Sequence, residues 1–203
     1  MCSTVRVVSQ LSLFSAEARP PGPADLAGLL CGPGQVVRFG AGDQARLSIE
    51  LPDPLRADAV IAAAAATGVA MTAVRTESGS TALRTAFRCD LVALAAAWTD
   101  GSVKAVPTGW QLDGSTLRLW ALAAGRPDER GGYLLGLDPQ APQTHEALIA
   151  AATRAGIPPA RVGGAALRIS GARRVRRLVE LVGPVPERIT STDWPRYWGR
   201  TAS

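Results

Sequence analysis

The 203-residue sequence is poor in the side chains from which disulfide frameworks and metal centres are built. It has three cysteines, Cys2, Cys31 and Cys89, with no Cys-x-x-Cys spacing, and a single histidine, His145. An odd number of scattered cysteines argues against a disulfide framework and against a zinc knuckle. One imidazole also leaves little for a Ser-His-Asp arrangement. We therefore expect no metal site and no cofactor.

Long apolar runs are missing as well. The Ala-rich stretch 60–66 is far shorter than the roughly 20 residues that span a bilayer. The N-terminus has Arg6 but no continuous apolar region followed by a cleavage site, so we expect no signal peptide. These patterns predict a cytoplasmic protein with no membrane partner.

Lysine is almost absent, because Lys104 is the only one among 22 basic residues. The charge is also uneven along the chain. Residues 1–150 contain 12 basic and 14 acidic side chains, whereas residues 151–203 contain 10 basic and 3 acidic ones. A basic C-terminal part favours a polyanionic partner, although such a run is also typical of a solvated surface.

Two proline- and glycine-rich breaks divide the chain. Residues 15–24, with three prolines, are expected to form an extended linker. Residues 99–109 form the second break. The end of the chain, 184–203, contains Trp194 and further aromatics among prolines, and it either packs on the body or awaits a partner.

The body repeats itself. Ala82-Leu83-Arg84 matches Ala166-Leu167-Arg168 at an offset of 84. Apolar residues then follow at the i, i+3, i+4, i+7 spacing of a helix in both copies. They are Leu91, Leu94, Ala95 and Trp98 in the first copy and Val175, Leu178, Val179 and Val182 in the second. This pattern indicates a duplicated unit of roughly 80–90 residues, too long for a solenoid repeat.

Secondary structure is expected in the same order in both copies. The first copy has helices near 25–31, 55–67 and 91–98, and strands near 35–39, 45–51, 70–76 and 81–89. The second has helices near 115–124, 143–155 and 173–182, and strands near 133–137, 160–163 and 166–170. The order predicts an α+β fold made of two αββαββα units.

One stretch gives conflicting signals. Residues 110–120 alternate in polarity around Asp113-Gly114, which is typical of a β-hairpin. The repeat instead requires a helix at 115–124, and we follow the repeat.

The residues from Leu26 to Gly34 resemble the signature helix of the LAGLIDADG homing endonucleases. The equivalent stretch 117–125 keeps the helical character and the final glycine. The layout looks most like the LAGLIDADG-like domain of the WhiA regulators. This resemblance implies a pseudo-twofold saddle over residues 24–186, with repeats at 24–100 and 110–186. Residues 1–23 and 187–203 are then tails, and the helix-turn-helix domain of WhiA has no counterpart.

In active members of that family each signature helix ends in a carboxylate that holds divalent metal. The matching positions here are Pro33 and Ala124, which cannot bind a cation. Asp128 and Glu129 come shortly after the second helix, in a loop. The resemblance therefore implies a non-enzymatic chain without catalytic residues.

The family's sheets form the DNA-binding face, and side chains alternate along a strand. Leu47, Ile49, Leu83, Phe87 and Leu167 are expected to face the core. Arginines on the opposite face suit phosphate contact, and ordinary solvated arginines in an arginine-rich chain are the equal alternative. The DNA-binding residues expected on this basis are Arg38, Arg46, Arg75, Arg84, Arg88, Arg161 and Arg168. Binding through them should be weak and largely independent of sequence.

The pentapeptide Gln10-Leu11-Ser12-Leu13-Phe14 matches the motif that binds the bacterial sliding clamp at every position. Leu13 and Phe14 would enter an apolar pocket and Gln10 would anchor the other end. An amphipathic edge strand over residues 5–14 is the alternative. Together these patterns favour a nucleoid-associated accessory protein of replication or repair. A WhiA-like regulator is the second hypothesis, and a surviving metal-dependent nuclease is the third.

Overall fold

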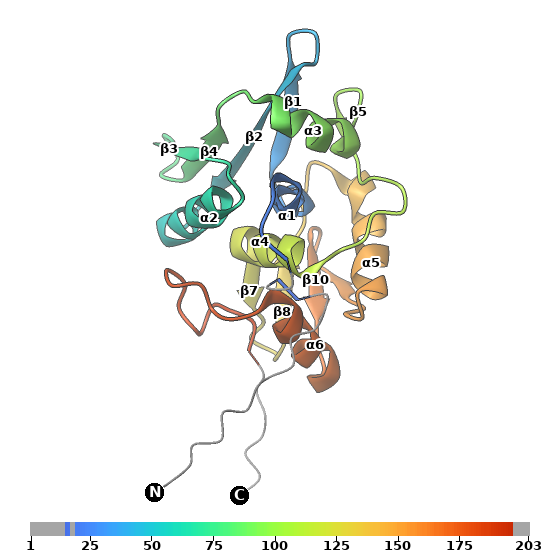
Figure 1. Ribbon diagram of the computed structural model, residues 1–203. Coiled ribbons are helices and arrows are strands. Elements are labelled where there is room, and N and C mark those ends of the chain that lie inside the picture. Colours follow the sequence, from blue (N-terminus) through green and yellow to red (C-terminus); the bar gives the residue numbers. More distant parts are fainter. Residues whose placement is uncertain (1–14, 17–18, 197–203) are drawn as a thin grey trace, which may run out of the picture.

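The computed structural model describes residues 15–16 and 19–196, which form two similar halves stacked on each other (Figure 1). The first half contains η1 (Pro23–Leu26), α1 (Ala27–Cys31), β1 (Gln35–Phe39), β2 (Gln44–Leu51), α2 (Pro54–Ala66), β3 (Met71–Arg75), β4 (Thr81–Thr85), η2 (Cys89–Leu91) and α3 (Val92–Trp98). The second contains α4 (Gly114–Ala124), β7 (Gly125–Pro127), β8 (Tyr133–Gly136), η3 (Pro142–Thr144), α5 (His145–Arg154), β9 (Ala160–Val162), β10 (Ala166–Ile169) and α6 (Ala172–Val182). A short hairpin of β5 (Thr99–Asp100) and β6 (Val103–Lys104) connects them.

The two four-stranded sheets have the same antiparallel topology. Their orders are β1-β2-β4-β3 and β7-β8-β10-β9, so each strand of the first sheet has a counterpart in the second. The α+β fold class and the duplication expected from the sequence are thereby confirmed. One strand is new: β7 follows directly on α4, where no strand was expected. Strand β4 is also shorter than expected, because regular pairing ends at Thr85.

The halves meet where α1 crosses α4 at the centre of the molecule (Figure 1). Gly28 makes this close approach possible. A β-carbon there would lie 2.7 Å from Cβ of Leu119 and 2.8 Å from the backbone nitrogen of Trp120, closer than real contacts allow. Leu29, Leu30 and Trp120 are fully buried around the crossing. A single apolar core consequently runs through both halves.

Asp113 resolves the conflict between hairpin and helix at residues 110–120. Its Oδ1 accepts a hydrogen bond from the backbone N–H of Thr116 at 2.8 Å, so Asp113 is the N-cap of α4. The Asp-Gly pair thus marks the start of a helix. In α4, Leu117, Leu119 and Trp120 are all buried, which explains why a period-2 pattern appeared in a helix that is apolar on most sides.

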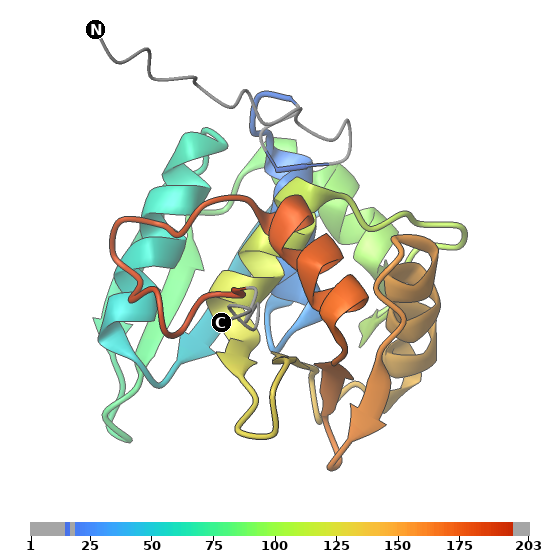
Figure 2. The same ribbon diagram turned by 90° about the horizontal axis from the view of Figure 1, so that it is seen from below.

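The proline-rich stretch expected to be an extended linker is instead fixed to the body. Ser15 is buried, and the backbone N–H of Ala16 donates to the carbonyl of Leu181 in α6 at 2.9 Å. Arg19 forms ion pairs with Asp25 and Asp113. Figure 2 shows this segment beside the helices, on the side away from the β7–β8 hairpin. The segment is therefore held against the surface of the body by these contacts, although its prolines exclude a helix.

The described part of the C-terminal tail packs on the body. Trp194 is 2% exposed, its Nε1–H donates to the carbonyl of Gly183 at 3.0 Å, and the guanidinium of Arg118 lies 5.2 Å from its ring centroid.

In α6 the buried residues include Leu181, whereas Val179 is only half-buried, so the expected apolar stripe is shifted by part of a turn. Within the described ranges, every helix is too short or too polar to cross a membrane.

Candidate nucleic-acid interface

Each sheet has one face packed against helices and one face turned away from them. In the first sheet, α2 and α3 pack against the face that carries Ala45, Leu47, Ile49 and Leu51. These four residues of β2 are buried, as expected from the alternation. Directly opposed residues of paired strands point to the same side. The register therefore defines the other side of each sheet, called here the outer face.

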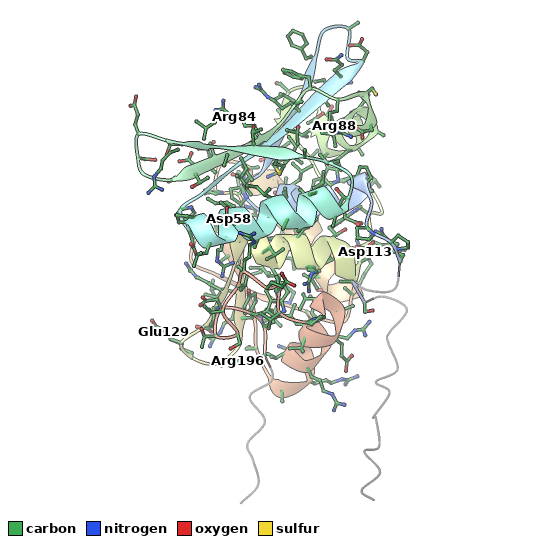
Figure 3. All side chains as sticks on the ribbon, turned by 60° about the vertical axis from the view of Figure 1, so that its left-hand side comes forward. Asp58, Arg84, Arg88, Asp113, Glu129 and Arg196 are labelled. Carbon is green, nitrogen blue, oxygen red and sulfur yellow. The ribbon has the colours of Figure 1, made fainter. Side chains whose placement is uncertain are left out.

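Arginines occupy equivalent positions on the two outer faces. Arg84 of β4 is opposite Ser48 of β2, and Arg168 of β10 is opposite Leu134 of β8. Figure 3 shows Arg84 on the side of its sheet away from α2. Arg46 of β2 shares the outer face with Arg84, because both alternate with buried neighbours.

A fourth outer-face arginine was missed by the sequence analysis. Arg126 of β7 is opposite Leu134 and therefore lies on the same face as Arg168. It is exposed. Its strand has only three residues, Gly-Arg-Pro, which give no alternation to detect. The one signal that could have predicted this strand is the repeat itself, in which two strands follow each central helix.

Three of the expected DNA-binding arginines lie on the opposite, helix-covered side. Arg38 is paired with buried Ala45, Arg75 with Thr81, and Arg161 with buried Leu167. Arg38 and Arg75 are exposed because they sit where their strands end. Arg161 instead reaches back to α5, where its guanidinium donates to Nδ1 of His145 at 3.2 Å. The assignment of these three to the outer face is wrong.

A β-bulge after Thr85 reverses two further expectations. Arg88 forms a bridge with Ala45, one residue out of step with the β2–β4 register, and the hydroxyl of Thr85 accepts the N–H of Leu47 in between. A slip of one residue exchanges the faces. Arg88 therefore turns to the helix side, where it pairs with Asp90 at 2.6 Å. Phe87, expected in the core, turns to the outer face.

The outer-face arginines differ in their partners. Arg168 forms an ion pair with Asp128 in the β7–β8 loop, so its positive charge is already balanced within the chain. The Cζ of Arg46 lies 4.6 Å from the ring centroid of Phe87. Among residues 15–16 and 19–196, no carboxylate pairs with Arg46, Arg84 or Arg126. These three remain available to an anionic ligand.

A polar cavity of about 350 Å³ opens on the first sheet near the end of α1. Arg84 and Glu50 both line it, together with Asp138 from the second half. Glu50 accepts a hydrogen bond from Ser78 at 3.3 Å. The cavity thus contains side chains of both charge signs. Because the two carboxylates repel phosphate, Arg84 by itself does not make this cavity a strong phosphate site.

The only lysine of the chain is buried beside this cavity. Lys104 Nζ donates to Asp138 Oδ2 at 3.0 Å and to the carbonyls of Gly32 and Gly34 at 2.6 and 2.8 Å. Its ammonium therefore satisfies the carbonyl groups that follow α1. Burial lowers the pKa of Lys104, although the hydrogen bond and charge of Asp138 act in the opposite direction. The second break, 99–109, is thereby a structural link and not a spacer.

Asp138 and His145 form the rest of this buried network. Gln35 Nε2 donates to Asp138 Oδ2 at 2.6 Å, and the N–H of Gln140 donates to Oδ1 at 2.9 Å. His145 Nε2 lies 2.8 Å from the Asp138 carbonyl. Because Arg161 can only donate to Nδ1, Nε2 carries the proton of a neutral imidazole. The single histidine is thus a structural residue.

Comparisons with known proteins agree with this architecture. A solved structure described as "The homing endonuclease I-WcaI bound to its DNA recognition sequence" superposes with a TM-score of 0.56. The superposition covers 86% of this chain and 82% of that one, at 13% sequence identity. The chain has a LAGLIDADG-like fold. Searches with family models and of curated proteins found no match.

In this LAGLIDADG-like chain the two central helices end at positions that carry no carboxylate. Pro33 follows α1 and Ala124 ends α4. Two acids of the second half are held in ion pairs: Asp138 binds Lys104 and Asp128 binds Arg168. Glu129 is exposed in the β7–β8 loop (Figure 3). Within the described ranges, no three Asp, Glu, His or Cys residues come together as metal ligands would. The clamp-like motif, residues 10–14, lies outside the described residues.

Proposed function

We propose that this chain is a non-catalytic accessory protein that binds duplex DNA through the outer faces of its two sheets and docks on the replication sliding clamp through residues 10–14. The observation that carries the DNA part is the placement of Arg84 and Arg126 at corresponding rows of two related sheets. Guanidinium groups without a carboxylate partner are well suited to phosphate oxygens. The solved homing endonuclease with a similar fold is bound to DNA, which supports this use of the fold.

The number of such arginines limits the affinity. Three outer-face guanidiniums, from Arg46, Arg84 and Arg126, have no carboxylate partner among the described residues, and Glu50 lies on the same face as two of them. Phosphate contacts carry no sequence information by themselves. Binding should therefore be weak, largely independent of sequence and strongly weakened by salt.

The absence of a carboxylate at Pro33 and Ala124 supports a non-catalytic role. In a two-metal reaction the carboxylates hold the ions against the scissile phosphate, and neither proline nor alanine can replace them. Asp128 and Asp138 are held in ion pairs, with Arg168 and Lys104, that reduce their capacity to bind a cation.

The clamp part rests on the sequence of residues 10–14. Gln10, Leu11, Leu13 and Phe14 match the bacterial clamp-binding motif, and such peptides bind by inserting apolar side chains in a groove. Ser15 directly after the motif is buried against the body. A clamp bound to the motif would consequently lie close to the helices, beside α6.

A WhiA-like transcription-associated regulator is the alternative function. The resemblance of the Leu26–Gly34 stretch and of the second, Trp-containing central helix to the WhiA sequence layout supports it. In that case residues 10–14 would have only a structural role. Clamp binding separates the two hypotheses.

The DNA part is tested with two variants of equal charge. Arg84→Ala with Arg126→Ala removes two outer-face guanidiniums, and Arg38→Ala with Arg75→Ala removes two exposed ones from the other side. We expect the first variant to weaken binding to a 20-base-pair duplex and to reduce the salt slope by about 2, because each lost phosphate contact contributes about 0.9. The second should bind within about twofold of the wild type. Equal effects of the two variants would show that the outer faces do not bind the duplex.

A further inference from the structure

Two phenylalanines and an arginine form a cluster on the outer face of the first sheet, in which Phe39 is exposed and Phe87 and Arg46 are half-buried. Phe39, the last residue of β1, is 61% exposed. Its ring centroid is 4.8 Å from that of Phe87, with 37° between the planes, and the Cζ of Arg46 lies 4.6 Å from the Phe87 centroid. We call Phe39, Phe87 and Arg46 the aromatic platform.

The platform is built by the fold and does not result from a frayed end. The register places Phe39 opposite Gln44 and Val37 opposite Arg46, so these side chains point to the outer face. The bulge after Thr85 turns Phe87 to the same face. Exposed Phe39 loses most of the free energy that burial of a phenylalanine would supply, and half-buried Phe87, which the bulge turns out of the core, loses part of it. This loss is compensated when a ligand covers the rings.

The chemistry of the platform fits one kind of ligand. Aromatic rings and guanidinium planes stack on the faces of bases that are not covered by neighbouring bases. In an intact duplex those faces are hidden, and only base edges and phosphates are available. Arg46, and Arg84 farther along the same face, have no carboxylate partner among the described residues and can contact phosphates of the strand, whereas Glu50 on that face limits how many phosphates it holds.

We propose that the aromatic platform binds the unpaired bases of single-stranded DNA, with Phe39 as the stacking ring. This inference rests on the proposed function, because it names the form of DNA that this outer face prefers. The second sheet offers no such cluster: the register places Arg126, Leu134, Ala160, Ala166 and Arg168 on its outer face. Single-stranded DNA should therefore bind the first half, and duplex DNA should use both.

The experiment compares a 5′-fluorescein-labelled 20-nucleotide oligothymidine with a 20-base-pair duplex, by fluorescence anisotropy on the full chain. Replacing Phe39→Ala should weaken single-strand binding about 5- to 150-fold, which is the effect of losing one base–aromatic stack. Duplex binding should change less than about twofold. Leu55→Ala, which truncates an exposed apolar residue of α2 on the helix side of the first sheet, is the matched control and should leave both affinities unchanged.

A second pair of variants separates stacking from apolar contact. Phe39→Trp keeps a ring and should retain single-strand binding, whereas Phe39→Leu keeps only bulk and should lose most of it. An oligonucleotide with 2-aminopurine at its centre should lose fluorescence on binding to the wild type, because the base stacks, and should lose less with Phe39→Leu. Circular dichroism checks that each variant is folded, as expected for a residue that is mostly exposed.

Each outcome decides between the proposals. If the wild type binds the duplex and Phe39→Ala leaves single-strand binding unchanged, the platform proposal is wrong and the proposed function stands. If Phe39→Ala weakens both forms equally, Phe39 contacts duplex DNA, and the single-strand assignment is wrong. If the wild type binds single strands through Phe39 but does not bind the duplex, the proposed duplex function is wrong and the platform stands. Binding to neither overturns both.

Discussion

Gly28 of α1 faces the backbone of Thr116 in α4 with no space for a side chain between them. The glycine in the Leu-Ala-Gly-Leu stretch is thus required by the packing of the two halves. The same crossing brings Leu119 and Trp120 to within van der Waals reach of α1. Helix packing therefore accounts for the glycine of this motif.

Replacing Gly28→Ala should lower the free energy of unfolding by about 2 kcal/mol. Alanine favours a helix by about 1 kcal/mol over glycine, but overpacking costs about 1–3 kcal/mol, or more where the clash is with backbone. Urea denaturation measures the change. Gly164→Ala is the control, because nothing lies within 4 Å of a β-carbon there, and it should change stability by less than about 0.5 kcal/mol. Similar effects at both glycines would contradict the crossing as described.

The Lys104–Asp138 pair should be costly to break and less costly to remove. Lys104→Met leaves a buried carboxylate supported only by Gln35 and the amide of Gln140, and should destabilise the chain by about 3–5 kcal/mol. Adding Asp138→Asn removes the unpaired charge, so the double variant should lose less than the sum of the single ones. Strict additivity in urea denaturation would mean that the two groups do not interact.

The same lysine predicts a pH dependence. Because burial lowers the pKa of Lys104 from its ordinary 10.5, the unfolded chain holds this proton over a pH range where the folded chain has lost it. The free energy of unfolding attributable to Lys104 therefore rises with pH through the interval between the lowered pKa and 10.5. The wild type minus Lys104→Met difference should increase over that interval. Cys31 and Tyr133, whose pKa values are raised by burial, occur in both proteins. A difference that falls with pH contradicts the prediction.

Supercoiled plasmid should remain intact with this protein in Mg²⁺ or Mn²⁺. The physical reason is the lack of carboxylates at Pro33 and Ala124, without which the ions have no fixed position at a phosphate. Agarose gels give the readout. Nicking that disappears in Asp128→Asn or Asp138→Asn protein would show that another pair of acids has taken over the reaction.

Clamp binding should depend on Leu13 and Phe14. Such a short peptide should bind with a Kd near 1 µM, about −8 kcal/mol, and burial of each apolar side chain contributes about 1.5–3 kcal/mol. Leu13→Ala with Phe14→Ala should therefore abolish binding in calorimetry. Val5→Ala with Val7→Ala, outside the motif, should have no effect.

The buried Ser15 adds a geometric condition to clamp binding. Residue 14 is a single residue, about 3.5 Å of extended chain, from a side chain packed on the body. Insertion of a flexible glycine–serine stretch before Ser15 should leave the affinity unchanged or raise it, because it relieves any clash with α6. Failure of the wild type to bind the clamp would remove the replication hypothesis and favour the WhiA-like one.

The architecture could be predicted from the sequence because the duplication repeats the same apolar pattern at a fixed spacing. Leu83 and Leu167 recur at a fixed offset, and both are completely buried in equivalent strands. The helix that begins after Asp113 was found from the repeat against its local pattern. Such predictions succeed in regular helices and strands, because there the spacing of apolar residues matches the spacing of buried positions.

The faces of single arginines were not predictable to the same extent. Alternation assigns Arg88 outward only if the strand has no bulge, and the sequence around Thr85 gives no sign of one. Arg38 and Arg75 are exposed at strand ends, so composition cannot tell which side they occupy. The burial of Lys104 depends on free carbonyls at Gly32 and Gly34, some 70 residues away in the chain.

The two sheets repeat each other in topology but differ in what their outer faces present. Phe39 and Phe87 lie on the first, whereas Arg126 and the ion pair of Arg168 lie on the second. A molecule with two identical halves would lie on a nucleic acid equally well after a half-turn. Here the half-turn exchanges the aromatic surface of the first sheet for the charged surface of the second. The two orientations of the protein along a nucleic-acid strand therefore differ in binding free energy. The protein would thus bind a nucleic-acid strand in one preferred orientation.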